Sequence, residues 1–235
     1  VGKPAPNGVE ALKARFAAVR SSPEATEYIQ AIRETRLVES FLAHELQFDW
    51  SCVELLYDPP GKTLGETEKA DLLLPDLKRA VGDPQRELDI VSPYFVPGKT
   101  GTKNLSAYPE SGIKLRIVTN SLAATDEGVV HAGYAKHRKA LLRSGTRLYE
   151  LKPDAPTDGH PKSGAGGSSA SLHGKTLSVD RTRVFVGSFN LDPRSANLNT
   201  EMGVMIEDPR LADALSDWVD QAQTVAYQVV LTPDG

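Results

Sequence analysis

Residues 171–201 read SLHGKTLSVDRTRVFVGSFNLDPRSANLNTE, and this stretch decides the fold of the 235-residue chain. It contains two short apolar arms, 176–179 and 184–186, whose residues are mostly β-branched or aromatic. A polar segment, 180–183, joins the two arms. Apolar arms of this composition around a polar connection predict a β-hairpin.

The hairpin would bring four polar side chains together. With a connection of two or four residues, Lys175 lies opposite Ser188 and His173 lies opposite Asn190. Residues two apart on a strand share a face, and so do directly opposed residues. We therefore expect an imidazole, an ammonium group, a hydroxyl and an amide to converge. Asp180 is at an odd offset from His173, so we expect it at the turn and in an ion pair rather than in this cluster.

This cluster suits a phosphodiester substrate. A histidine can attack phosphorus or protonate a leaving oxygen, because its ordinary pKa lies near neutrality. The Lys175 ammonium would face the non-bridging oxygens, which the hydroxyl and amide would hydrogen-bond as charge develops. Glu201, at the start of the next predicted strand, is expected to hold the His173 imidazole through its other nitrogen. A surface hairpin with ordinary turn residues is the alternative for His173 taken alone, but the combination of residues favours a site.

The remaining chain alternates predicted strands and helices. Short apolar runs predict strands at 51–57, 88–91, 113–119, 147–151 and 202–206. Helical spacing and start signals predict helices at 72–81, at 129–143 and from Asp208-Pro209 onward, the last with an apolar face made of Leu211, Leu215, Trp218 and Val219. This order predicts an α/β layered domain over residues 51–235, with a mixed β-sheet flanked by helices.

Three segments of different character surround these elements. Residues 1–50 predict a helical lead-in, with helices at 9–20, 22–33 and 37–46. Residues 153–171 are rich in Gly, Ser and Pro, so they predict a mobile loop directly before the hairpin. Residues 191–200 predict an irregular segment.

Charge and composition limit the partners of the chain. The net charge is −4, so no global positive field attracts nucleic acid, and we expect no nucleic-acid partner. The single cysteine, Cys52, cannot form an internal disulfide. No apolar run is long enough to span a bilayer, and no signal peptide is visible. Because no His, Cys and Asp residues have ligand spacing, we expect neither a metal nor a cofactor.

The hairpin sequence resembles a known signature. The six positions of the HxK(x)4D(x)6GSxN signature of the phospholipase D superfamily are all matched, by His173, Lys175, Asp180, Gly187, Ser188 and Asn190. Other stretches from about Cys52 onward are similar to the C-terminal half of bacterial cardiolipin synthases, namely 92–97, 119–123, 131–145, 149–151, 190–195 and 199–201. The resemblance therefore implies a phospholipase D-like domain.

This resemblance also implies a chemistry. It implies metal-independent phosphodiester transfer through a covalent phosphohistidine, with one histidine as nucleophile and a second as general acid. The implied reaction moves a phosphatidyl group from a phosphatidylglycerol-like lipid to another lipid's glycerol headgroup, in the cytoplasm or peripherally on the inner face of a bacterial membrane. The implied catalytic residues are His173, Lys175, Asp180, Ser188, Asn190 and Glu201. By the same resemblance, Tyr94 and His131 border the substrate.

The chain departs from the two-motif pattern of these enzymes, because it contains one complete motif. His137 and His160 begin segments with HxK spacing, but neither is followed by the aspartate or by GSxN. We expect the first motif upstream of Val1, since the lead-in resembles a connection between two lobes. A second copy of the chain is the alternative source of a partner motif. With an upstream nucleophile, His173 would be the general acid, and this chain alone would not complete a turnover.

Two other functions remain open from the sequence. One is a phosphodiesterase or nuclease that acts as a homodimer of single-motif chains, although the negative charge and the lack of interleaved aromatic and basic residues argue against nucleic acid. The other is an inactive half that binds phosphate-containing headgroups. Gly174-Lys175-Thr176 resembles the end of a P-loop, but Ser169 stands where that motif requires its first glycine. His137 lies in an apolar helical stripe, so we expect a core histidine.

Overall fold

The computed structural model of the protein describes residues 8–23, 25–26, 29–30, 36–46, 48–153 and 172–233. The chain divides into two units, Val1–Trp50 and Ser51–Gly235. The first unit contains helices α1 (Gly8–Arg20) and α3 (Arg36–Leu42). The first agrees with the predicted helix at 9–20. The prediction of a helix to residue 46 was too long, because His44 has a positive φ of 58°. Of the predicted helix at 22–33, the described residues 23, 25–26 and 29–30 are helical and the other half of the segment lies mostly outside the described residues. The predicted loop at 153–171 lies outside the described residues except for residue 153.

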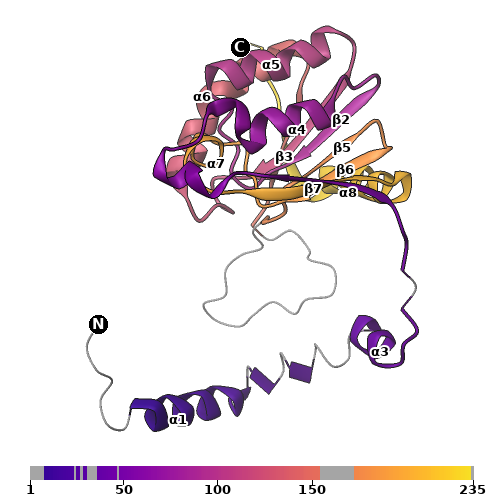
Figure 1. Ribbon diagram of the computed structural model, residues 1–235. Coiled ribbons are helices and arrows are strands. Elements are labelled where there is room, and N and C mark those ends of the chain that lie inside the picture. The colour runs from indigo at the N-terminus through magenta and orange to yellow at the C-terminus, as the bar shows by residue number, and fades with distance from the viewer. Residues whose placement is uncertain are drawn as a thin grey trace. The chain divides into compact units, whose positions relative to one another are not determined.

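The second unit is built on one mixed sheet of eight strands (Figure 1), in the order β1-β7-β6-β5-β2-β3-β4-β8. Its strands are β1 (Cys52–Tyr57), β2 (Glu87–Val91), β3 (Lys114–Asn120), β4 (Arg147–Leu151), β5 (Thr176–Val179), β6 (Arg183–Gly187), β7 (Met202–Glu207) and β8 (Ala226–Val229). β2, β3 and β4 are parallel, whereas all other neighbours are antiparallel. The predicted mixed α/β sheet is therefore confirmed.

Helices cover both faces of this sheet. α4 (Leu73–Val81), α5 (Gly98–Glu110) and α6 (Gly128–Ser144) lie on one face, and α8 (Pro209–Val225) lies on the other (Figure 1). The short helix α7 (Pro193–Asn197) follows β6. The main core lies under the three helices and contains residues such as Leu73, Ile90, Ile117, Tyr134 and Phe185.

The apolar face predicted for α8 was partly wrong. The sequence predicted that Leu211 and Trp218 would share the buried face, but both are substantially exposed. The buried positions are Ala212, Ser216, Val219 and Ala222, with Leu215 packed beside them. Small residues allow the helix to approach the sheet closely, and the Ser216 hydroxyl donates to Ser178 of β5. The helix therefore packs through its small residues rather than through its largest apolar ones.

The topology defines the edge at which function is expected. Ligands of open α/β sheets bind beyond the carboxyl ends of the parallel strands. Val91 at the end of β2 pairs with Thr176 at the start of the antiparallel strand β5. The residues that follow β2, β3 and β4 therefore lie at the same edge as the residues that precede β5, which include His173 and Lys175.

Candidate active site

The predicted hairpin forms, but its register differs from the prediction. β5 pairs with β6 so that Thr176 lies opposite Val186 and Val179 lies opposite Arg183. The connection therefore has three residues, not two or four. Gly187, rather than Ser188, lies opposite Lys175 and donates its amide to the Lys175 carbonyl at 3.1 Å. The cause lies in the turn, where Asp180 and Arg181 both have positive φ values, of 52° and 56°.

Asp180 lies in this turn, at the opposite end of β5 from Lys175, roughly 16 Å away by the rise of a strand. Its carboxylate accepts hydrogen bonds from the backbone amides of Gln85, Arg86 and Glu87 at 2.8, 2.7 and 2.9 Å. Burial would raise the pKa of Asp180, but these three donors lower it overall. The position of Asp180 therefore does not support its predicted catalytic role. This motif residue instead anchors the hairpin to the start of β2.

His173 and Lys175 lie together just before β5. The Lys175 Nζ donates to the His173 carbonyl at 2.9 Å and lies 3.5 Å from its Nε2. Burial lowers the pKa of the half-buried Lys175 ammonium, and the nearby carboxylates of Glu201, Asp126 and Asp192 only partly oppose this. The His173 side chain is exposed. An anion that approaches this edge would therefore meet an imidazole and a partly desolvated cation.

Glu201 has different partners from those predicted. Its side chain accepts from Ser188 Oγ at 2.5 Å, from Ser195 Oγ at 2.7 Å and from Asn199 Nδ2 at 3.3 Å. Within the described residues it forms no hydrogen bond with His173, so the predicted carboxylate–imidazole contact is absent from this structure. Glu201 is only 6% exposed. From this buried position, Glu201 therefore orients the hydroxyl groups of Ser188 and Ser195.

Ser188 and Asn190 occupy the segment after β6. Ser188 donates its hydroxyl proton to Glu201, while its Oγ accepts from the Met202 amide at 3.1 Å. Asn190 is buried, and its Oδ1 has no hydrogen-bond partner among the described residues. A buried amide oxygen without a protein partner is costly, so Asn190 carries an unsatisfied acceptor next to the motif serine.

Tyr94 and His131 have different environments. The Tyr94 hydroxyl donates to both carboxylate oxygens of Asp126, at 2.8 and 2.9 Å, and burial together with this carboxylate raises the pKa of Tyr94 to about 12. Because Asp126 also acts on Lys175, Tyr94 belongs to the rim of the site. His131 instead lies in a buried cluster between α6 and β4, where it contacts Tyr134 and Arg138. Burial, and then Arg138, lower its pKa. Substrate contact by His131 stays a prediction.

Sequence patterns missed several residues that shape the site. Asp126 falls in a loop with no motif, and Ser195 lies in a segment predicted to be irregular. Asp58 begins the turn sequence Asp58-Pro59-Pro60-Gly61 and carries no motif, yet it accepts the Glu201 amide at 3.0 Å. His137, expected in the core, is only partly buried, and its Nδ1 lies 3.0 Å from Thr102 Oγ1 between α5 and α6. His160 lies outside the described residues.

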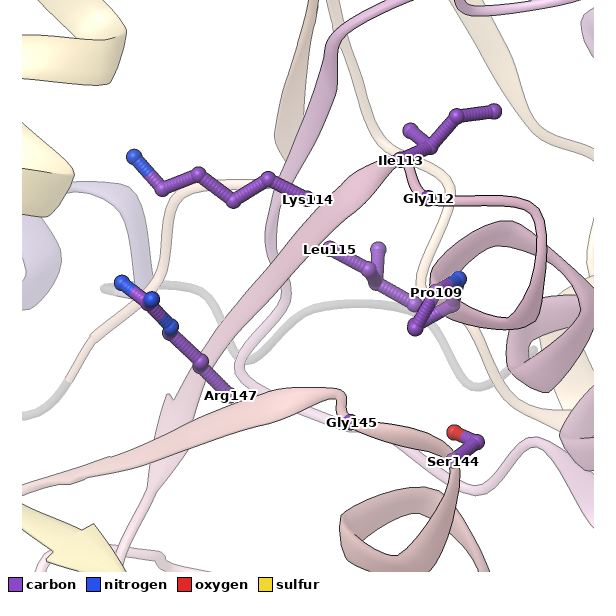
Figure 2. Close-up of a pocket in the computed structure, with 8 residues that line it drawn as sticks. All are labelled: Pro109, Gly112, Ile113, Lys114, Leu115, Ser144, Gly145 and Arg147. Atoms are coloured by element: carbon purple, nitrogen blue, oxygen red, sulfur yellow. The ribbon is translucent and has the colours of Figure 1, made fainter.

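A hollow in the surface lies away from this edge (Figure 2). It has a volume of about 220 Å³ and is lined by Pro109, Gly112, Ile113, Lys114, Leu115, Ser144, Gly145 and Arg147. These residues precede or begin β3 and β4, at the edge of the sheet opposite His173. The described residues contain no group of three His, Cys, Asp or Glu side chains that could hold a metal ion. None of the helices in the described ranges is both long and apolar enough to cross a membrane.

A mixed α/β sheet with a complete HxK(x)4D(x)6GSxN hairpin at its ligand edge defines the phospholipase D-like class. Residues 77–222 match the family described as "Cardiolipin synthase, PLD-like domain", and the chain belongs to this family. It is 43% identical over 207 residues to cardiolipin synthase C of Escherichia coli, a match that covers 87% of this chain and 44% of that protein. The chain thus spans less than half the length of this relative.

Two solved structures share the fold. The phospholipase D family member Nuc from Salmonella typhimurium superposes with a TM-score of 0.56 at 18% identity, covering 77% of this chain and all of that one. The phosphatidylserine synthase of Haemophilus influenzae gives a TM-score of 0.53 at 18% identity, covering 75% of this chain and 40% of that one. At these identities, the likeness establishes the fold alone.

Proposed function

We propose that this chain is one catalytic half of a phosphatidyltransferase of the cardiolipin synthase type. The observation that carries the proposal is the hairpin edge, where the His173 imidazole and the Lys175 ammonium lie 3.5 Å apart beside Ser188 and Glu201. Family membership supports a phospholipid as the substrate. The reaction would take place where that lipid lies, at a membrane surface and peripherally on its inner face.

The proposed reaction divides into two steps. A histidine of a partner half attacks phosphorus, so that a P–N bond forms and the P–O bond to the leaving alcohol breaks. His173 gives its proton to the oxygen of that alcohol. In the second step the acceptor's hydroxyl attacks the phosphohistidine, so that a new P–O bond forms and the P–N bond breaks, and the hydroxyl proton passes to His173. Lys175 offsets the charge on the non-bridging oxygens in both steps, and Asn190 adds an amide contact. The chemistry needs no metal.

A partner half is part of this proposal. The chain has one complete motif and spans less than half of its E. coli relative. The face of the sheet that carries α8 is apolar on β1, where Val53, Leu55 and Tyr57 are 57%, 55% and 56% exposed. Met202 continues this face on β7, opposite Tyr57 and next to the site residue Glu201. A second phospholipase D-like half, supplied by an upstream segment or a second copy, would cover this face and bring its histidine to the site.

A phospholipid is favoured over a nucleic acid by local charge. Asp126 and Asp192 lie close enough to Lys175 to act on its pKa. A polyanionic strand that ran past His173 would meet these carboxylates, whereas a single phosphodiester would meet Lys175. Nuclease activity is therefore the weaker candidate.

The test uses the intact enzyme that contains this chain. His173→Ala should lower phosphatidyl transfer at least about 1000-fold, because the leaving alcohol has no proton donor. Lys175→Ala should lower it about 100-fold to 1000-fold, since charge on phosphorus oxygens is left uncompensated. Transfer of labelled phosphatidyl groups between lipids in mixed micelles measures both. The control is Lys139→Ala on the exposed surface of α6, which should keep wild-type activity. Full activity in His173→Ala would refute the proposal.

The same assay distinguishes the two possible sources of the partner half, an upstream segment and a second copy of this chain. If an upstream segment supplies it, the chain alone is inactive and recovers activity when that segment is added. If a second copy supplies it, activity of the chain alone rises with its concentration. If an upstream segment supplies the partner half, rapid quenching with a labelled substrate should trap phosphate on a histidine of that segment and not on His173.

A further inference from the structure

A buried ion pair lies directly behind the candidate site. Asp58 and Lys62 follow β1, and their side chains are 0% and 2% exposed. The Lys62 Nζ lies 2.6 Å from Asp58 Oδ2. Burying two charges is costly unless the remaining donors and acceptors are also satisfied. The partners that satisfy them connect the pair to the site.

Asp58 holds the main chain of Glu201. Its Oδ2 accepts the Glu201 amide at 3.0 Å, and the Asp58 amide donates to the Glu201 carbonyl at 2.8 Å. Asp58 Oδ1 accepts the amide of Leu73, the first residue of α4, at 2.8 Å. One carboxylate therefore joins the start of α4 to the start of β7, where Glu201 lies.

Lys62 holds the other side of Glu201. Its Nζ donates to the Ser195 carbonyl in α7 at 2.7 Å. The Ser195 hydroxyl in turn donates to Glu201 Oε1 at 2.7 Å. With Oε1 tied inward in this way, Oε2 is the oxygen that receives the Ser188 hydroxyl. The ion pair thus reaches the motif serine through one carboxylate.

We infer that Asp58 and Lys62 are positioning residues that fix the Glu201 carboxylate, and through it Ser188, in the orientation that phosphoryl transfer requires. This inference rests on the proposed function. Neither residue touches the substrate in this arrangement, because both side chains are buried. Asp58 and Lys62 act on the geometry of Glu201. When its main chain and its Oε1 are both held, its Oε2 can point in only one direction. Small displacements of such a group reduce the rate of a positioned reaction.

The chain offers a matched control. Asp89 and Arg116 form a second buried ion pair, with both side chains 0% exposed, between β2 and β3. Arg116 also contacts Asp220 of α8. This pair contacts none of the hairpin-edge residues 173, 175, 188 and 201. Asp58→Asn and Asp89→Asn therefore make the same chemical change in two buried pairs, of which only one is joined to the site.

The experiment measures kcat, KM and thermal stability for both variants in the intact enzyme. Both should lower Tm. Asp58→Asn should lower kcat about 10-fold to 100-fold with KM within about 2-fold, whereas Asp89→Asn should keep kcat within about 2-fold. In a Glu201→Gln background, Asp58→Asn should have almost no further effect on kcat, because it acts through Glu201. If Asp58→Asn does not fold, Ser195→Ala removes the connecting hydroxyl and leaves the pair intact, with the same expected loss.

Two outcomes would overturn the inference: a wild-type kcat in Asp58→Asn or Ser195→Ala, or a loss that multiplies with that of Glu201→Gln. Failure of the proposed function is distinguishable, because the wild-type enzyme would then transfer no phosphatidyl group. In that case amide hydrogen exchange at Glu201 still tests the pair. Asp58→Asn should accelerate it and Asp89→Asn should not, and equal exchange in the two variants contradicts the positioning role.

Discussion

Gly187 occupies a motif position for a packing reason. A Cβ atom at this residue would lie 2.6 Å from the Met202 carbonyl oxygen and 2.8 Å from the Phe185 ring. The Phe185 ring is buried and fills the space between β6 and β7, so neither neighbour can retreat easily. The glycine therefore lets β6 approach β7 closely enough for the Ser188 hydroxyl to reach Glu201.

Gly187→Ala should lower the free energy of unfolding by about 2–3 kcal/mol, because the added methyl group overpacks the strand pair. Urea denaturation of the chain measures this. Gly128→Ala is the control, since no atom lies within 4 Å of its added Cβ and it begins helix α6. That change should be neutral or stabilising by up to about 1 kcal/mol. Equal stability of the two variants would contradict the packing argument.

The hairpin turn is held to β2 by one side chain. Three backbone amides donate to the Asp180 carboxylate, and this lowers its pKa below that of an unfolded aspartate although burial opposes the shift. A depressed folded pKa contributes stability above the unfolded pKa, and that stability is lost as pH falls through the folded pKa. The Asp180 carboxylate therefore stabilises the fold at neutral pH, and this stabilisation is lost in acid.

Asp180→Asn should lower the unfolding free energy at pH 7 by about 1–2 kcal/mol, with partial exposure keeping the value modest. Asparagine tolerates the positive φ of this position, so the change tests charge rather than backbone strain. The difference from wild type should shrink below about pH 4, where the wild-type carboxyl group begins to gain its proton. Urea unfolding between pH 2.5 and 7 measures it.

Asp213→Asn is the control for this series, because its carboxylate is 53% exposed and pairs only distantly with Arg181, at 3.4 Å. Its effect should stay below about 0.5 kcal/mol. A stability difference for Asp180→Asn that is the same at pH 3 and pH 7 would rule out the ionised anchor.

Sequence patterns predicted elements better than they predicted connections. The arms of the hairpin were correct, because β-branched residues indicate strands directly. Its register was wrong by one residue, because Asp180 and Arg181 adopt left-handed conformations that only glycine or asparagine would have signalled clearly. Helix α5 was missed altogether, since GKTGTKNLSAYPE has two glycines, a proline and no regular apolar stripe. It forms against α6 and β3, and such tertiary support leaves little local signal.

The candidate site was predictable in the same uneven way. His173, Lys175 and Ser188 flank the two hairpin strands, so local spacing assigned them to one end of the hairpin, although the predicted pairing of Lys175 with Ser188 was wrong by one residue. The partners of Glu201 were not predictable, because Ser195 and Asp58 reach it from segments with only turn or loop signals. The Asp58 contact joins residues 143 positions apart, and no local pattern encodes such a contact.

At the scale of the whole domain, α8 covers only part of one face of the sheet. It packs mainly on β5 and β6 and also contacts β3, β4 and β8, whereas β1 lies at the opposite end of the strand order from β8, beyond β7. Val53, Leu55 and Tyr57 point to this face, because side chains alternate along a strand and Leu56, between Leu55 and Tyr57, is buried in the main core on the other face. An exposed apolar row on an edge strand indicates an interaction surface. This row is close to the site, because β1 pairs with β7, which begins directly after Glu201.

Leu55→Lys should therefore weaken association of this chain with the partner half at least about 10-fold, equivalent to about 1.4 kcal/mol, because a charge enters an apolar contact. Its own Tm should change little, since Leu55 is 55% exposed in the chain. Leu64→Lys is the control, because Leu64 is 72% exposed in the 3-10 helix η1 (Pro60–Leu64), outside this face. Calorimetric titration and recovery of transfer activity on mixing the halves should respond to the first substitution and not to the second. Equal affinity of both variants would show that the partner half binds elsewhere.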